Sequence, residues 1–138
     1  MKWIDSIITA FNRFTGITAR RVKAQRNASD WLETVDQFIK AYAIEQDNVD
    51  MEKILGKSGD IKFELTTLTY NGRELLGRSG NLRNNAAVEV IAEIVDNLDR
   101  IRRYMFSPAL QKERLRQALV KLRSSAGELY KILAENKS

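Results

Sequence analysis

The sequence predicts an all-α protein, a bundle of four to five helices built on a long C-terminal antiparallel helical hairpin. Three observations support this fold class. Apolar residues recur at intervals of three and four along most of the chain. The 138 residues include one proline and seven glycines, so the sequence has few helix breakers for its length. The last third contains two long amphipathic segments joined by a very short connection.

Residues 1–15 are predicted to form an amphipathic helix that ends at Gly16. Its apolar face consists of Trp3, Ile4, Ile7, Ile8, Phe11 and Phe14. Residues 17–28 are basic and polar, and both a linker and a continuing helix fit them. We expect a single helical domain over 1–138, in which 1–28 is a detachable amphipathic helix with a basic linker.

A second helix is predicted over 30–45. Asp30 and Glu33 are three residues apart and match a capping box, which marks a helix start. The apolar stripe that follows comprises Trp31, Leu32, Val35, Phe38, Ile39 and Tyr42. A short helical turn is predicted over 50–55 and ends at Gly56.

Residues 57–85 fit two structures. The alternation of Ile61, Phe63 and Leu65, followed by Asn71-Gly72, is typical of a short β-hairpin over 61–78. A helix with Asp60 as its N-cap and Gly72 as its C-terminal glycine also fits. We favour the helix because the second arm, residues 73–76, contains no β-branched residue.

The C-terminal region carries the most regular pattern. A long helix is predicted over 85–106, and Ser107-Pro108 is typical of a helix restart with Ser107 as the N-cap. The next helix carries a heptad-like seam of Leu115, Leu119, Leu122, Ala126, Leu129 and Leu133. Two helices joined this closely must fold back on each other. The predicted core comprises Trp31, Val35, Phe38, Ile39, Tyr42, Val88, Ile91, Val95, Leu98, Leu115, Leu119, Leu122, Leu129 and Leu133.

Composition excludes several kinds of chemistry. The chain has no cysteine and no histidine, which rules out disulfides, thiolate or imidazole metal sites, cysteine nucleophiles and histidine bases. We therefore expect no enzyme, no metal and no cofactor. The enzyme class that fits least badly is a Mg²⁺-dependent all-α nucleotide hydrolase, whose paired acids would be Glu33/Asp36 and Glu93/Asp96. These acids fall largely outside the apolar seams, so a solvated face explains them better.

The charges are sorted along the chain, whose net charge is +5. Five basic residues and no acid lie between Arg13 and Arg26. Residues 27–60 hold eight acids and three bases, whereas residues 100–123 hold eight bases and a single acid, Glu113. A concentrated positive field of this kind attracts phosphate backbones.

If the hairpin forms, the basic residues of its two helices meet at one tip. The candidate nucleic-acid-binding residues are Arg100, Arg102, Arg103, Tyr104, Lys112, Arg114 and Arg116, and Phe106 lies in the same turn. Aromatic side chains at such a tip can stack on bases of a single strand. Basic residues at a helix C-terminus suit the helix dipole, but those at 112–116 oppose it. A secondary basic patch comprises Arg20, Arg21, Lys23 and Arg26.

These features predict a non-enzymatic helical binding module, an accessory subunit that contacts RNA or DNA phosphates without sequence preference. An acidic protein is the other partner considered, and further protein subunits are expected. An alternative is an adaptor or homo-oligomer that pairs through its helical seams. A third hypothesis is peripheral membrane association through residues 1–26. Since no signal peptide or membrane-spanning stretch is recognisable, we expect a cytoplasmic location.

Overall fold

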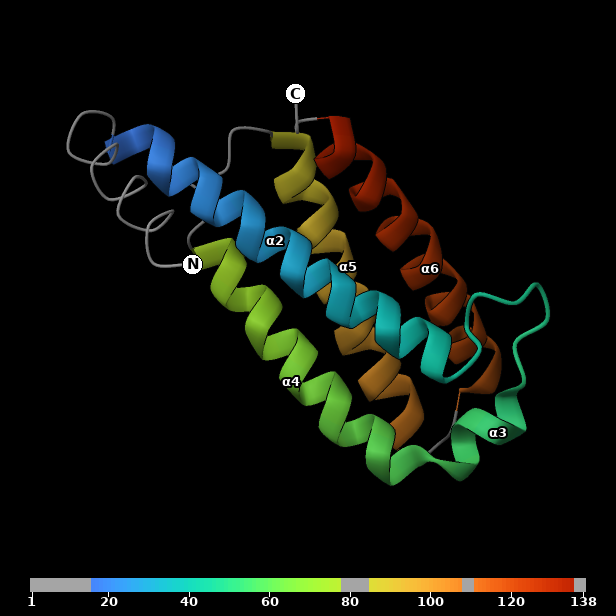
Figure 1. Cartoon of the computed structure of the whole chain (residues 1–138). Helices are drawn as coiled ribbons and strands as arrows, with labels where there is room; N and C mark the ends of the chain where they lie inside the picture. The colour runs from blue at the N-terminus through green and yellow to red at the C-terminus, as the bar shows by residue number, and fades with distance from the viewer. Residues whose placement is uncertain (1–15, 78–84, 108–110, 136–138) are drawn as a thin grey trace.

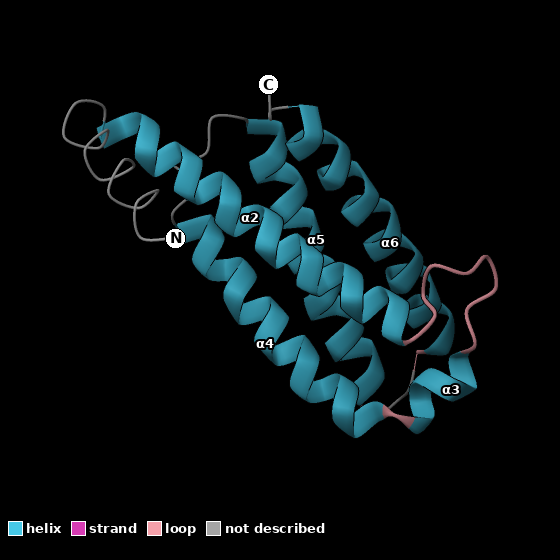
Figure 2. Ribbon diagram, in the orientation of Figure 1, coloured by secondary structure: helices cyan, strands magenta, loops and turns pink. Residues whose placement is uncertain are grey.

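The computed structural model describes residues 16–77, 85–107 and 111–135, and within these ranges it is helical with no strand. The helices are α2 (Gly16–Ala41), α3 (Met51–Gly56), α4 (Ser58–Gly77), α5 (Asn85–Phe106) and α6 (Lys112–Glu135). The prediction of an all-α bundle is confirmed (Figures 1 and 2). The alternative β-hairpin over 61–78 is wrong, because α4 runs without interruption to Gly77.

The four long helices alternate in direction (Figure 1). α2 and α5 run one way, and α4 and α6 run the other. α5 packs most extensively against α6, then against α4, and α2 closes the bundle against α4 and α6. The predicted C-terminal hairpin therefore forms the frame of the fold. The short helix α3 lies at the end of the bundle where α5 ends and α6 begins (Figure 1).

The heptad-like seam of α6 faces the core as predicted, since all six of its residues are buried. On α5 the buried stripe is wider than the sequence suggested. Ile94 and Ile101 are fully enclosed, and Val90 is 5% exposed. Val88, a predicted core residue, is only half-buried because it lies at the margin of this stripe. α5 packs against both α4 and α6, which explains why its apolar face is broad.

Helix α2 begins at Gly16, so the predicted start at Asp30 is wrong. Residues 17–28, for which linker and helix were both open, form the first half of this helix. Asp30 is an exposed residue in the helix interior. A capping-box pattern also arises by chance on the solvated face of a longer helix, where its acids interact with water.

Helix α2 ends at Ala41, earlier than the expected end near Glu45. The amide N–H of Ala43 donates to the Lys40 carbonyl at 3.2 Å, and that of Ile44 donates to the Ile39 carbonyl at 2.8 Å. Ala43 adopts a positive φ of 54°. This is the Schellman arrangement, in which a left-handed residue closes the helix. Ile44, the next residue, is fully buried and anchors the turn in the core.

Asp50 caps α3 as the predicted helical turn requires, because its carboxylate accepts a hydrogen bond from the Lys53 amide at 3.2 Å. Asn71-Gly72, in contrast, is neither a turn nor a helix end. Gly72 is buried inside α4, and a Cβ atom there would lie 2.6 Å from both Trp31 Cζ2 and Val95 Cγ2. Glycine therefore allows α4 to approach α2 and α5 closely at this point.

Helix α6 begins at Lys112, whereas Ser107 lies outside any helix, so the predicted restart at Ser107-Pro108 is a few residues early. Pro108 itself lies outside the described residues, as does the predicted helix over 1–15. Among the described helices, none combines the length and the apolar character that a membrane span requires.

Candidate nucleic-acid interface

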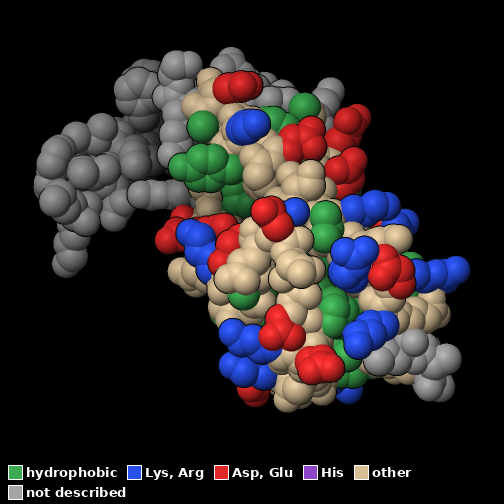
Figure 3. All heavy atoms as spheres, turned by 90° about the vertical axis from the view of Figure 1, so that its right-hand side faces the viewer, with side chains coloured by type: hydrophobic (Ala, Val, Ile, Leu, Met, Phe, Trp, Pro, Cys, Tyr) green, Lys and Arg blue, Asp and Glu red, His purple; other side chains and the backbone are tan. Residues whose placement is uncertain are grey.

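The predicted basic residues gather at one end of the bundle. Arg100, Arg102 and Arg103 lie on the last turns of α5, and Lys112, Arg114 and Arg116 on the first turns of α6; we call these six residues the basic tip. Figure 3 shows Lys and Arg side chains concentrated on the lower half of the face that carries α6 and α3, with acidic side chains among them. The hairpin thus brings together cations that are separate in the sequence.

Within α5 the tip is divided between two sides of the helix. The guanidinium groups of Arg102 and Arg103 both contact the Asp99 carboxylate, at 2.8 and 3.2 Å. Arg73 of α4 lies 3.8 Å from the same carboxylate. The hydrogen bond from Arg102, together with the positive charges of Arg103 and Arg73, lowers the pKa of Asp99 below its ordinary value. These two arginines therefore belong to the α4 side of the tip.

The other four cations of the tip differ in their partners. Arg100 pairs with Asp96 at 3.0 Å, and Arg116 pairs with Glu113 at 2.7 Å. Arg114 donates a hydrogen bond to the Gln111 amide oxygen at 2.9 Å, which leaves its charge unmatched. Lys112 contacts no acidic group in the described part of the chain.

Arg100, Tyr104 and Arg114 meet on the opposite side, where they line a cavity of about 150 Å³ between α5 and α6. The remaining lining residues are Asn97, Gln117, Ala118 and Lys121. Asn97, Gln117 and Lys121 were missed as candidate site residues. Asn97 could have been found from the sequence, because it is a polar residue within the apolar stripe of α5. In the structure it is only 6% exposed. Lys121 lies two helical turns beyond Arg114, outside the cluster that the sequence suggested.

Tyr104 is half-buried beside this cavity, and Phe106 is 37% exposed. The Lys62 ammonium of α4 lies 5.5 Å from the centre of the Phe106 ring, within the range of a cation–π interaction. The two aromatic residues singled out by the sequence therefore serve different contacts. Tyr104 borders the cavity between α5 and α6, and Phe106 faces α4.

Arg123 performs a structural role that the sequence did not reveal. Its Nη1 donates hydrogen bonds to the backbone carbonyls of Glu45 and Gln46, at 3.2 and 2.9 Å. These carbonyls lie in the loop between α2 and α3, so Arg123 fastens that loop to α6. The acidic side chains of residues 30–45 form no ion pair with the basic tip in the described ranges.

The acidic pairs considered for Mg²⁺ do not face a common cavity. Glu33 and Asp36 line a cavity of about 780 Å³ between α2 and α6. Glu93 and Asp96 line a cavity of about 350 Å³ between α5 and α6. Among the described residues, no three or more acidic or other metal-ligating side chains are grouped to hold a metal ion.

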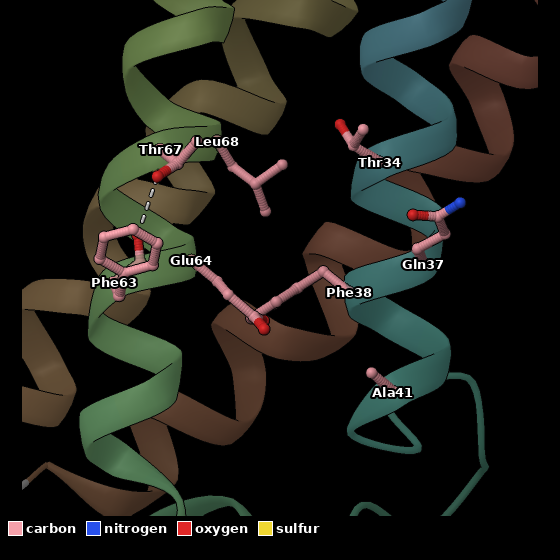
Figure 4. Close-up of a pocket in the computed structure, with 8 residues that line it drawn as sticks. All are labelled: Thr34, Gln37, Phe38, Ala41, Phe63, Glu64, Thr67 and Leu68. Atoms are coloured by element: carbon pink, nitrogen blue, oxygen red, sulfur yellow. Dashed lines mark hydrogen bonds between the residues drawn. The ribbon is translucent and has the colours of Figure 1, made fainter.

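A groove of about 300 Å³ between α2 and α4 is mainly apolar (Figure 4). Phe38 and Glu64 point toward each other across it, and Phe63 at its edge is 75% exposed. Burial, followed by the hydrogen bond and negative charge of Glu64, raises the pKa of nearby Tyr42 to about 12. Tyr42 therefore remains protonated at neutral pH.

The secondary basic patch of Arg20, Arg21, Lys23 and Arg26 lies on the first half of α2. The side chains of this patch lie outside the described part of the structure, as does the amphipathic segment 1–15 on which the membrane hypothesis depends.

We expect Asp99→Asn to lower the free energy of unfolding at pH 7 by about 1 kcal/mol, because partly exposed ion pairs are individually weak. A carboxylate with a lowered pKa stabilises the folded state above its unfolded-state pKa. That contribution is lost as the pH falls through the lower folded-state value. Urea unfolding at pH 7 should therefore show a lower free energy of unfolding for the variant than for wild type. Well below pH 3.8 the two free energies should be equal. A difference that persisted in acid would contradict this role of Asp99.

Comparisons of the chain with protein-family models, with curated proteins and with solved structures find no match in any of the three.

Proposed function

We propose that this chain is a non-enzymatic binding module that contacts the phosphates of RNA or DNA through its basic tip, as an accessory subunit of a larger complex. The observation that carries the proposal is the charge of the first turn of α6. Lys112 and Arg114 are exposed and have no acidic partner among the described residues, although positive charge at a helix N-terminus opposes the helix dipole. A phosphate bound there would offset this cost.

The other residues of the tip support the same reading. Arg100 and Arg116 keep part of their guanidinium groups exposed while an acid in the same helix holds them in place. An ordered cation loses less conformational entropy when it binds an anion. Contacts of this kind depend on the phosphate backbone, so they supply affinity without sequence preference.

Binding can be measured by fluorescence anisotropy with a single-stranded RNA and a duplex DNA between about 50 and 200 mM salt. About five phosphate contacts predict log–log slopes of roughly −3.5 for the single strand and −4.5 for the duplex. The double variant Lys112→Glu/Arg114→Glu should weaken binding and reduce the duplex slope in magnitude by about 2. Acidic residues suit a helix N-terminus, so the fold should tolerate this change.

The matched control is Lys40→Glu/Lys131→Glu, which changes the net charge equally but lies on the groove between α2 and α6. The control variant should bind the nucleic acids with an affinity well above that of Lys112→Glu/Arg114→Glu. Asp99→Asn should strengthen binding, because it removes a negative charge that holds Arg102 and Arg103. Equal losses in the two charge-reversal variants would show that net charge, rather than the tip, determines binding.

A second candidate function is protein–protein interaction, either as an adaptor or as a homo-oligomer. Exposed aromatic side chains favour it: Phe63, Tyr70 and Tyr130 are 75%, 62% and 70% exposed. Such residues are enriched in protein interfaces. If no nucleic acid binds at low salt, the mass in solution by light scattering becomes the informative measurement. A mass above that of the monomer would then favour pairing through these surfaces.

A further inference from the structure

The cavity of about 150 Å³ between α5 and α6 has an unusual lining. Three of its residues are cations, namely Arg100, Arg114 and Lys121, and none is an acid. Lys121 forms no ion pair in the described ranges. The remaining polar groups, on Asn97, Tyr104 and Gln117, can all donate hydrogen bonds. A small concave site with three positive charges and several donors suits an oxyanion.

Asn97 supplies a second, independent observation. Its side chain is only 6% exposed, yet it has no hydrogen-bond partner among the described residues. It lines both this cavity and the adjoining one between the same helices. Among the described residues, Thr69 Oγ1 is the buried side-chain polar atom without a partner, so the Asn97 amide is not sealed in the core and can donate to a group in the cavity. Its position at the wall of the cationic cavity indicates a group that accepts hydrogen bonds.

Groups on the rim hold two of the cations in place. Asp96 contacts the Arg100 guanidinium at 3.0 Å, and Gln111 accepts from that of Arg114 at 2.9 Å. The adjoining cavity of about 350 Å³ shares Arg100 and Lys121 with this one, but it is also lined by the acids Glu93, Asp96 and Glu128. Negative charge on that side repels an anion, so the favourable position is confined to the cationic end of the groove.

We propose that this cavity, which we call the phosphate pocket, binds one phosphate group. Arg100, Arg114 and Lys121 supply the positive charge, and the Asn97 amide donates from the buried side. Part of this assignment rests on the proposed function: the phosphate is a phosphodiester of the bound strand if the tip binds nucleic acid. A free phosphate or the phosphate group of a small molecule would occupy the same pocket by the same chemistry.

The test is a titration of the ¹⁵N-labelled chain with sodium phosphate at constant ionic strength, with chloride as the reference salt. The Asn97 side-chain amide signals should shift saturably with phosphate and not with chloride. Lys121→Ala should weaken this binding about tenfold or more, as expected for loss of a hydrogen bond to a charged group. Lys131→Ala is the matched control, because Lys131 is an exposed lysine on the same helix outside the pocket.

The absence of a saturable Asn97 shift, or an equal response in Lys121→Ala and wild type, would overturn the proposal. Competition then identifies the source of the phosphate. If sodium phosphate displaces a labelled oligonucleotide and Lys121→Ala binds it less tightly, the pocket holds a backbone phosphate. If phosphate binds but no oligonucleotide does, the proposed function fails while the phosphate pocket stands, and its ligand is a small phosphorylated molecule.

Discussion

Trp31→Ala is expected to lower the free energy of unfolding by about 3–5 kcal/mol, the usual loss for a large aromatic residue removed from a core. Trp31 is 5% exposed, and its indole N–H donates to the Leu68 carbonyl at 3.0 Å. The substitution removes both the apolar contact of α2 with α4 and the hydrogen bond between them. A loss of this size is a large fraction of the stability of a typical domain.

Urea unfolding followed by circular dichroism would measure this loss. Trp31→Phe is the informative companion, because it retains an aromatic ring but removes the indole donor. It should lose clearly less stability than the alanine variant. Equal losses would assign the effect to the hydrogen bond alone, and a loss under about 1 kcal/mol in the alanine variant would contradict the structure at this contact.

Gly72→Ala is expected to destabilise the protein by about 1–3 kcal/mol, although helix propensity alone predicts a gain of about 1 kcal/mol. The added methyl group has no room, because its Cβ would lie 2.6 Å from both Trp31 Cζ2 and Val95 Cγ2. The indole ring of Trp31 and the β-branched side chain of Val95 are both stiff, so neither moves aside easily. The helices must separate locally, which weakens the contacts of α4 with α2 and α5.

Gly127→Ala is the matched control for this prediction. Gly127 also lies inside a long helix, but a Cβ atom there would meet no heavy atom within 4 Å. This variant should gain about 0.5–1 kcal/mol from helix propensity. Two stabilised variants would contradict the close approach at Gly72. In a Trp31→Phe background the loss caused by Gly72→Ala should shrink, because the two residues are in contact.

The C-terminal hairpin was predictable because its signal is long and regular. Six apolar positions along α6 follow the same heptad-like spacing. The connection to α5 is so short that the two helices must pack antiparallel. The start of α2 was not predictable in the same way. Asp30 and Glu33 satisfy a local rule for a helix start, and only the structure of residues 16–28 decides against it.

Gly72 shows why local rules also failed within α4. Asn-Gly is a strong turn signal when the chain is considered alone. Here the glycine lies against Trp31 of α2, which is separated from it in the sequence by the end of α2, a loop and α3. The sequence favoured a helix in this region because residues 73–76 contain no β-branched residue, but it placed Gly72 at the end of that helix and could not show that the glycine lies inside it.

The candidate site was predicted in composition but not in geometry. Successive helical residues are rotated by about 100°, so neighbouring cations leave α5 in different directions. Arg102 and Arg103 meet Asp99 toward α4, while Arg100 turns toward α6. Asn97 lies one turn before Arg100 on the same helix, whereas Lys121 joins them only through the packing of α5 against α6, which no local pattern encodes.

The contact of Arg123 with the loop after α2 has a consequence for the order of events during synthesis. The Gln46 carbonyl leaves the ribosome 77 residues before the guanidinium that binds it. Until α6 has been translated, that loop depends on water for its hydrogen bonds. The loop before α3 therefore gains its hydrogen bonds to Arg123 only when the last helix docks, and until then its backbone stays accessible to a chaperone or a protease.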